Sequence, residues 1–266
     1  MWKGIALSGV SVAPSTEDLR SISALGGTHV RLEAMAGANM AGIHEYVTTK
    51  TSLTPVWLLG KGILPGRWAH TTYVKAVEQV MTVLHRAGPV AWVELLSEPN
   101  LGSGHPSSLL FYDYIAAVNA GAARVKTISR ATGVIAGGIF AHATSGMEYF
   151  HLADEDYTTD VTAQGWHPYL NTASPLEQSD LSKRITEVRQ TRKRPLVITE
   201  AGWDARVCGE ELQAANVTAL LERARMEGVL GTLVFSLHDA PEAVPALHYG
   251  IYNRKAAQAF KGARVL

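Results

Sequence analysis

The stretch Ala91-Trp-Val-Glu-Leu-Leu-Ser-Glu-Pro-Asn100 starts as an apolar β-type run and ends abruptly at Glu98-Pro99. Proline has a fixed φ and no N–H group, so it cannot continue the hydrogen-bond ladder of a sheet. We therefore expect Glu98 where a buried strand opens into a loop. A carboxylate placed there is fixed by the sheet and can still reach a ligand, whereas the alternative is an ordinary exposed loop glutamate.

A second stretch, Pro195-Leu-Val-Ile-Thr-Glu-Ala-Gly-Trp203, has the same form. A short strand of branched apolar residues runs into Glu200, and the small residues Ala201 and Gly202 follow, where a chain leaves a sheet. The two stretches together predict two carboxylates at the ends of two strands.

Eight apolar runs of strand length alternate with helical periodicity along the chain. They are Gly4–Ser8, Thr28–Leu32, Thr54–Leu59, Val90–Leu96, Gly133–Gly138, Val161–His167, Leu196–Thr199 and Gly231–Ser236. Continuous apolar runs are typical of strands that are buried on both faces of a parallel sheet. We therefore predict an α/β fold, a single (β/α)8 TIM barrel spanning residues 1–266. An open doubly wound sheet is the alternative, but the sequence lacks the glycine fingerprint expected after its first strand.

The helical periodicity predicts where several of the intervening helices lie. Tyr73, Val77 and Leu84 fall on one apolar stripe, and the first helix is expected to begin near Pro14–Glu17, where a hydroxyl can cap free N–H groups. The pattern around Asn39–Thr49 is the weakest.

Glu98 and Glu200 end the fourth and seventh of these strands. Three βα units separate them at about 34 residues each, which is close to the ~31 residues per unit of a (β/α)8 barrel. Because all strands of such a barrel end at the same rim, we expect the two carboxylates to face each other across its mouth.

The composition limits the classes of partner. The chain has 266 residues, 47% of them hydrophobic, and its 24 basic and 24 acidic residues give zero formal net charge. Without a basic excess we expect no nucleic acid and no membrane as partner, and a neutral surface suits a neutral ligand such as a sugar. No apolar run approaches the ~20 residues of a membrane span, and no signal peptide is recognisable. We therefore leave open whether the chain is cytoplasmic or part of a longer secreted or virion-associated protein, and we leave its oligomeric state open.

Two carboxylates across one cleft suit the cleavage of a glycosidic bond, where one protonates the leaving oxygen and the other attacks the sugar or activates water. Arg31, which ends the run His29-Val30-Arg31 at the second strand, could hold a nearby carboxylate ionised by charge-assisted hydrogen bonds, whereas the alternative is a solvated loop arginine. His167 and Tyr169, two residues apart at the end of the sixth strand, could both point into the cleft. No metal is expected, because the ten histidines show neither His-x-His nor His-Glu-x-x-His spacing.

Three tryptophans, Trp68, Trp166 and Trp203, are expected just beyond predicted strand ends. Their rings could stack on sugar rings, and burial in the core is the equally common alternative.

These segments resemble the retaining glycoside hydrolases of clan A, in which catalytic glutamates lie on strands four and seven of the barrel. Glu94-x-x-Ser97-Glu98-Pro99 resembles the Glu-x-x-Asn-Glu-Pro segment of the clan, and Ile198–Trp203 is similar to its nucleophile strand. The segments Phe235–Asp239 and Tyr249–Tyr252 look like the last strand and closing segment of families 5 and 39. The resemblance covers the whole chain.

The resemblance implies a role for each matching residue. Glu98 would be the general acid and then the general base, and Glu200 the nucleophile. Arg31 and Tyr169 would support Glu200, His167 would contact Glu98 or the sugar, and Glu94 would be a buried carboxylate near Arg31. Apart from the resemblance, we also expect Ser97, Trp68, Trp203 and His238 among the residues that bind the substrate. The implied substrate is an oligo- or polysaccharide with β-linkages, and no cofactor is implied.

The sequence departs from the clan at two positions. Ser97 stands where the clan has an asparagine that binds the 2-hydroxyl of the sugar, and the last strand lacks the usual tryptophan. These departures support an alternative, a non-catalytic carbohydrate-binding barrel within a larger assembly, and they leave open which glycan is recognised and whether attack is internal or terminal.

Overall fold

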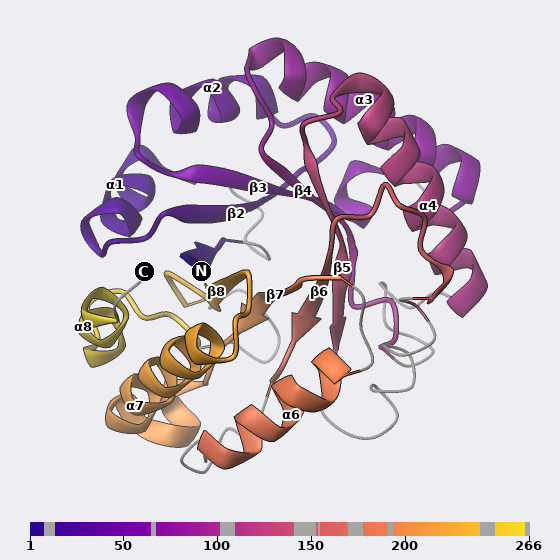
Figure 1. Cartoon of the computed structure of the whole chain (residues 1–266). Coiled ribbons are helices and arrows are strands. Elements are labelled where there is room, and N and C mark those ends of the chain that lie inside the picture. The colour runs from indigo at the N-terminus through magenta and orange to yellow at the C-terminus, as the bar shows by residue number, and fades with distance from the viewer. Residues whose placement is uncertain are drawn as a thin grey trace.

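Eight parallel strands close into a barrel in a computed structural model of the chain (Figure 1). The structure describes residues 1–7, 14–64, 68–101, 110–140, 153, 155–169, 178–190, 194–239 and 248–263. The strands follow one another around the barrel in chain order, and β8 pairs with β1 to close it. The predicted (β/α)8 TIM barrel is confirmed.

The strands match the eight apolar runs closely. They are β1 (Trp2–Ala6), β2 (His29–Glu33), β3 (Thr54–Leu59), β4 (Trp92–Ser97), β5 (Gly133–Phe140), β6 (Ala163–His167), β7 (Leu196–Ala201) and β8 (Gly231–Phe235). The first strand begins two residues earlier than expected, and Ser8 at its predicted end lies outside the described residues.

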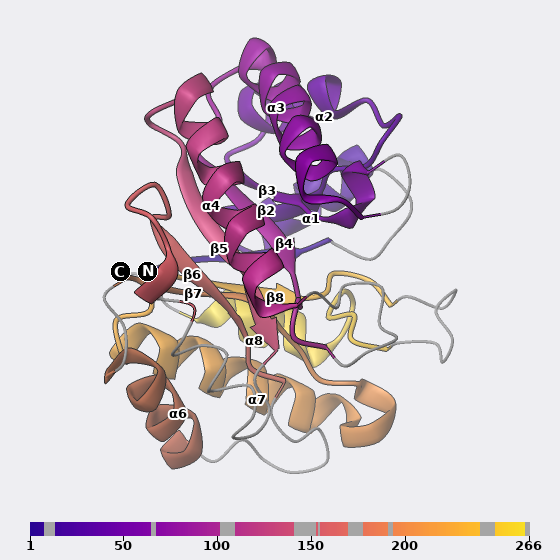
Figure 2. The same cartoon turned by 90° about the vertical axis from the view of Figure 1, so that its right-hand side faces the viewer.

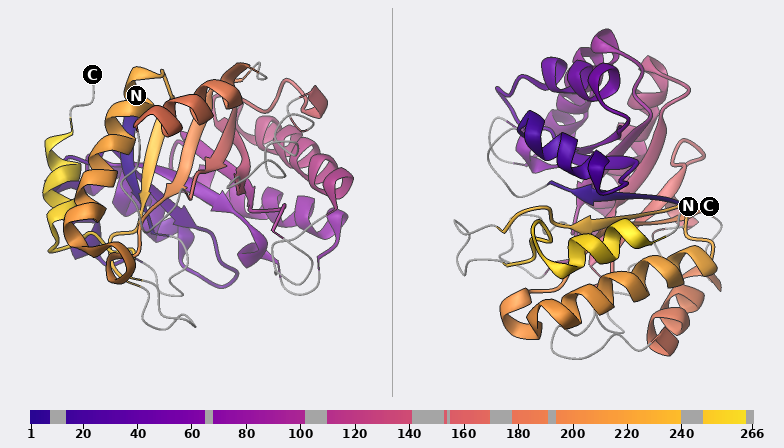
Figure 3. Two further views of the ribbon diagram at one scale, coloured as in Figure 1. Left: turned by 90° about the horizontal axis from the view of Figure 1, so that it is seen from below. Right: turned by 90° about the vertical axis from the view of Figure 1, so that its left-hand side faces the viewer.

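Helices surround the strands on the outside of the barrel (Figures 2 and 3). In the described residues they are α1 (Thr16–Ala24), α2 (Met40–Lys50), α3 (His70–Ala87), α4 (Phe111–Ile128), α6 (Gln178–Gln190), α7 (Ala205–Met226) and α8 (Lys255–Gly262), with a short 3-10 turn at Lys61–Ile63. Within these ranges no helix combines the length and the hydropathy that a membrane crossing requires.

Short polar side chains set where the first helices begin. Ser15 caps α1 by accepting a hydrogen bond from the backbone N–H of Asp18, whose carboxylate accepts one from the N–H of Ser15 in return. Asn39 caps α2 in a similar way, with its side chain accepting from the N–H of Gly42. This cap explains why a helix forms where the apolar periodicity is weak.

The interior of the barrel changes from apolar at one end to charged at the other. A separate buried cluster, Val56, Ile135, Ala163 and Val197, packs against Trp2, Trp92 and Leu230 near the starts of the strands. Toward the strand ends, the buried side chains Arg31, Glu94, His167 and Thr199 come from four different strands. Side chains from strands so far apart around a barrel can meet only across its interior. The fold therefore places a layer of charged and polar side chains inside the barrel, beneath the rim formed by the strand ends.

The regular strand geometry is interrupted where the glutamates lie. Leu96 and Glu98 have positive φ values of 67° and 49°, a conformation that costs a non-glycine residue of order 1–3 kcal/mol. The register between β7 and β8 also shifts between Ile198 and Ala201, on either side of Glu200. Such irregularities re-aim side chains at the rim of a barrel.

Candidate active site

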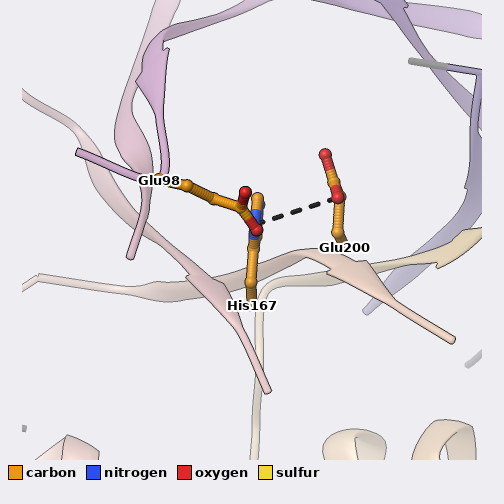
Figure 4. Close-up of side chains that lie close together, drawn as sticks. All are labelled: Glu98, His167 and Glu200. Atoms are coloured by element: carbon orange, nitrogen blue, oxygen red, sulfur yellow. Dashed lines mark hydrogen bonds and ion pairs between the residues drawn. The ribbon is translucent and has the colours of Figure 1, made fainter. Parts of the chain in front are cut away.

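Glu98, His167 and Glu200 converge at the mouth of the barrel (Figure 4). Glu98 directly follows β4, His167 ends β6 and Glu200 lies near the end of β7. One carboxylate oxygen of Glu98, one of Glu200 and a ring nitrogen of His167 all lie within 4.8 Å of one another. The glutamate side chains retain 20% and 12% of their exposure, so both can meet a ligand. The predicted meeting of the two carboxylates at one rim is confirmed.

Arg31, in the middle of β2, binds two of the carboxylates. Its Nε donates to Oε2 of Glu94 at 2.5 Å, and its Nη1 donates to Oε1 of Glu200 at 2.5 Å. The guanidinium is fully buried. Burial alone would lower the pKa of Arg31, but the charges of Glu94 and Glu200 outweigh it and raise that pKa further. Arg31 is therefore a permanent cation beneath the site.

Both oxygens of Glu200 accept a hydrogen bond. Oε1 accepts from Arg31, and Oε2 accepts from the hydroxyl of Tyr169 at 2.8 Å. Burial by itself would raise the pKa of Glu200, but the charges of His167 and Arg31 and the hydrogen bonds from Tyr169 and Arg31 lower it below its usual range. Glu200 is thus held as a carboxylate.

His167 lies between the two ends of a hydrogen-bonded chain. Its Nδ1 is 2.9 Å from Oε1 of Glu98 and its Nε2 is 3.0 Å from the hydroxyl of Thr199, which donates to Oε1 of Glu94 at 3.0 Å. Burial would lower the pKa of His167, but the nearby Glu200 and Glu98 raise it. The candidate acid Glu98 is therefore connected to a buried imidazole.

Gly138 on β5 shapes the floor of the site. Its N–H donates to Oε1 of Glu94 at 2.9 Å and its carbonyl accepts from the N–H of Glu98 at 2.8 Å. A Cβ atom at this position would lie 2.0 Å from Nε2 of His167, so only glycine leaves room for the ring. Neither Gly138 nor Thr199 stands out in the sequence as a site residue, although a Gly-Gly pair within a strand indicates a close approach of another group.

A group of aromatic rings adjoins Glu200 through Tyr169. Phe140 stacks on Tyr169 with ring centroids 5.9 Å apart, and Tyr249 packs edge-on against Tyr169 at 6.0 Å and against Phe235 at 5.7 Å. All four side chains are half-buried. Phe235 is the aromatic residue at the end of β8, the strand on which the sequence lacks a tryptophan.

The structure places the other predicted site residues in different surroundings. Ser97 lies 3.4 Å from Nη2 of Arg31, so it is part of the site. Trp68 is half-buried and packs against Tyr73 at 5.1 Å. Nε2 of the His238 ring lies 2.6 Å from Oδ1 of Asp18, near the start of α1. Among the described residues, the polar partner of this ring is therefore an aspartate and not a glutamate of the site.

The prediction of an open stacking face is wrong for Trp203. Its side chain is 1% exposed and belongs to the main hydrophobic core. Trp166 lies within β6, not beyond it, and is fully buried. Both rings follow the alternative of core burial, because the apolar space between strands and helices takes up large rings at these positions.

Glu98, His167 and Glu200 could each offer one ligand atom to a metal ion. Both oxygens of Glu200 already accept hydrogen bonds, and one of the two donors is the guanidinium of Arg31. A cation at this position would therefore compete with a fixed positive charge, so the donor set fits an ion-pair network better than a metal centre.

The barrel fold is shared with solved structures of several glycoside hydrolases. No protein-family model matches the sequence, and no curated protein sequence matches it. Several solved structures match its fold. The crystal structure of Thermotoga maritima Cel5A in complex with mannotriose superposes with a TM-score of 0.70 at 14% identity, covering 97% of both chains.

Two other glycoside hydrolases show the same fold. A family 128 (subgroup I) endo-β-1,3-glucanase from Amycolatopsis mediterranei gives a TM-score of 0.69 at 15% identity, covering 99% of this chain and 100% of that one. A family 39 glycoside hydrolase from Bacteroides cellulosilyticus gives a TM-score of 0.65 at 15% identity. The match covers 97% of this chain but only 62% of the family 39 chain.

Proposed function

We propose that this protein is a retaining glycoside hydrolase that cleaves a β-glycosidic bond, with Glu98 as acid/base and Glu200 as nucleophile. The observation that carries the proposal is the approach of the two carboxylates, in which one oxygen of Glu98 and one oxygen of Glu200 lie within 4.8 Å of each other. Retaining enzymes keep their carboxyl groups ~5–5.5 Å apart, whereas inverting enzymes need ~6.5–9.5 Å to admit a water. The short separation supports attack by a carboxylate over attack by water.

The surroundings of the two glutamates support different roles. Glu200 accepts hydrogen bonds from Arg31 and Tyr169 and has a lowered pKa, which suits an ionised nucleophile. Glu98 is the more exposed of the two and is bound to His167, which can exchange a proton with it.

In the proposed reaction, Glu200 attacks the anomeric carbon while Glu98 gives its proton to the departing glycosidic oxygen. The product is a covalent glycosyl-enzyme and a free sugar hydroxyl. Glu98, now a carboxylate, takes a proton from water, and that water displaces Glu200 from the anomeric carbon. The two steps return both carboxylates to their starting states.

We infer that the substrate is an oligo- or polysaccharide with β-linkages. Half-buried rings at Phe140, Tyr169, Tyr249 and Phe235 offer apolar faces of the kind that sugars stack on. Structures of the Amycolatopsis glucanase hold laminari-oligosaccharides, and the Thermotoga enzyme holds mannotriose. Ser97, beside Arg31, is the side chain we assign to the 2-hydroxyl of the sugar.

Activity assays on β-linked polymers and nitrophenyl glycosides test the proposal. We expect Glu200→Gln and Glu98→Gln to lose at least about 100-fold in kcat, since each removes a group that acts in the transition state. Glu45→Gln, an exposed change on α2, is the control and should keep full activity. Sugar binding by the parent protein without any turnover would contradict the proposal and favour the non-catalytic binding barrel.

A further inference from the structure

The polar side chains beneath the mouth form a continuous chain of hydrogen bonds whose directions can be worked out. It runs from Arg31 through Glu94, Thr199 and His167 to Glu98. The first four side chains are fully buried, so water does not offer them other partners. The direction of each bond is therefore set by its neighbours.

Glu94 fixes one end of the chain as an acceptor. Its Oε2 accepts from Nε of Arg31, and its Oε1 accepts from the backbone N–H of Gly138. Both donors are N–H groups that cannot reverse their role. The single proton of the Thr199 hydroxyl, 3.0 Å from Oε1, is therefore directed to Glu94.

A hydroxyl that has given its one proton can only accept from its other partner. That partner is Nε2 of His167, 3.0 Å away, so Nε2 carries a proton. The negative charge of Glu94, 3.9 Å from Nε2, favours the same arrangement. The opposite neutral tautomer would set the lone pair of Nε2 against the lone pairs of Thr199.

We propose that Thr199 is a positioning residue that locks His167 in the Nε2-protonated form, so that Nδ1 and Glu98 share one further proton. In the neutral form of His167, Nδ1 accepts from protonated Glu98. In the charged form, Nδ1–H donates to the Glu98 carboxylate across the same 2.9 Å contact. In both forms the proton that an acid catalyst must deliver is present in the Glu98–His167 pair.

The charged groups facing His167 are consistent with this assignment. Glu98 and Glu200 approach Nδ1 at 2.9 Å and 3.9 Å, and Glu94 approaches Nε2 at 3.9 Å, while Arg31 is the opposing cation. This inference rests on the proposed function for its catalytic meaning, but the tautomer itself is a property of the resting protein.

Nitrogen-15 NMR of the histidine ring tests the assignment without reference to activity. The signal of His167 is identified by its loss in a His167→Gln variant. We expect a proton on Nε2 in the parent protein and in Thr199→Ser, which keeps the hydroxyl. Thr199→Val replaces the hydroxyl with a methyl group of similar size and should allow the Nδ1-protonated tautomer to appear. A neutral His167 in the parent protein with its proton on Nδ1 would overturn the proposal.

The catalytic part is tested by comparing leaving groups. We expect Thr199→Val to lower kcat/KM about tenfold for glycosides whose leaving group needs protonation, and to leave dinitrophenyl glycosides nearly unchanged, because general acid catalysis supplies ~10²–10⁴ of rate. Thr199→Ser should stay within about twofold of the parent on both. Equal losses on both substrates would overturn the positioning role. If no glycoside is hydrolysed, the proposed function fails while the NMR result still decides the tautomer.

Discussion

The guanidinium of Arg31 is fully buried and contacts carboxylates from two other strands, Glu94 on β4 and Glu200 on β7. Removing one partner of a buried ion pair leaves an uncompensated charge, which typically costs ~3–5 kcal/mol. We expect Arg31→Met to lower the free energy of unfolding at pH 7 by about that amount, as measured in denaturant. Arg31→Lys keeps the positive charge but not the paired contacts, so its free energy of unfolding should lie between those of the parent and Arg31→Met. An unchanged free energy of unfolding in Arg31→Met would contradict this account.

The lowered pKa of Glu200 links folding to pH. A carboxyl whose pKa is lower in the folded state stabilises the protein above its unfolded pKa of ~4.3, and this contribution is lost as the pH falls toward the folded value. Glu200→Gln has no such group. As the pH falls from 6 to 3, we therefore expect the free energy of unfolding of the parent to decrease relative to that of Glu200→Gln. A difference that stays constant over this range would show that the pKa of Glu200 is not lowered.

On β5, the backbone of Gly138 approaches the ring of His167 too closely for any side chain. Gly138→Ala would place a Cβ 2.0 Å from Nε2 of His167, so either the ring or the strand must move. We expect the variant to lose most of its activity, and its His167 NMR signal should shift. Gly262→Ala makes the same chemical change in open space at the end of α8 and should alter neither. A fully active Gly138→Ala would show that the position of the ring is not critical.

The end of β4 shows how far a strand can be predicted from its residues. The apolar run and Pro99 place Glu98 just after the strand, and the structure has it there. The left-handed backbone of Leu96 and Glu98 was not predictable, because leucine and glutamate carry no preference for positive φ. That local conformation is imposed by tertiary contacts such as the bond from the N–H of Glu98 to the carbonyl of Gly138.

Over the whole molecule, strand number, order and closure followed from apolar runs at barrel spacing, because each βα unit carries its own local signal. The hydrogen-bonded chain through Thr199 could not be predicted from the sequence. It joins residues from different strands, and their meeting depends on strand register and bulges. The prediction that the ring of Trp203 is open to the cleft was wrong for a related reason. A ring near a strand end can turn to the core or to the cleft, and Trp203 turns to the core.

We expect the two ends of the barrel to serve different purposes, stability at one end and the proposed chemistry at the other. Trp92 packs at the end opposite the site, over Gly133 and against Trp2. Truncating a packed tryptophan typically costs ~3–5 kcal/mol, and the half-buried Trp92 belongs at the low end of that range. We expect Trp92→Ala to lower the free energy of unfolding by about 3 kcal/mol and to leave kcat/KM unchanged when assayed well below the melting temperature. The exposed Tyr112 is the matched aromatic control, and Tyr112→Ala should cost under about 0.5 kcal/mol. A large loss of kcat/KM in folded Trp92→Ala would contradict this separation of tasks.

The proposed function requires that Glu200 attacks the sugar and forms a covalent intermediate. A 2-deoxy-2-fluoro glycoside with an activated leaving group slows the breakdown of such an intermediate, so the trapped enzyme can be digested and its peptides identified by mass spectrometry. We expect one sugar per protein, attached to Glu200. A sugar on another residue, or hydrolysis of a natural substrate with inversion at the anomeric carbon and no trapped enzyme, would contradict it.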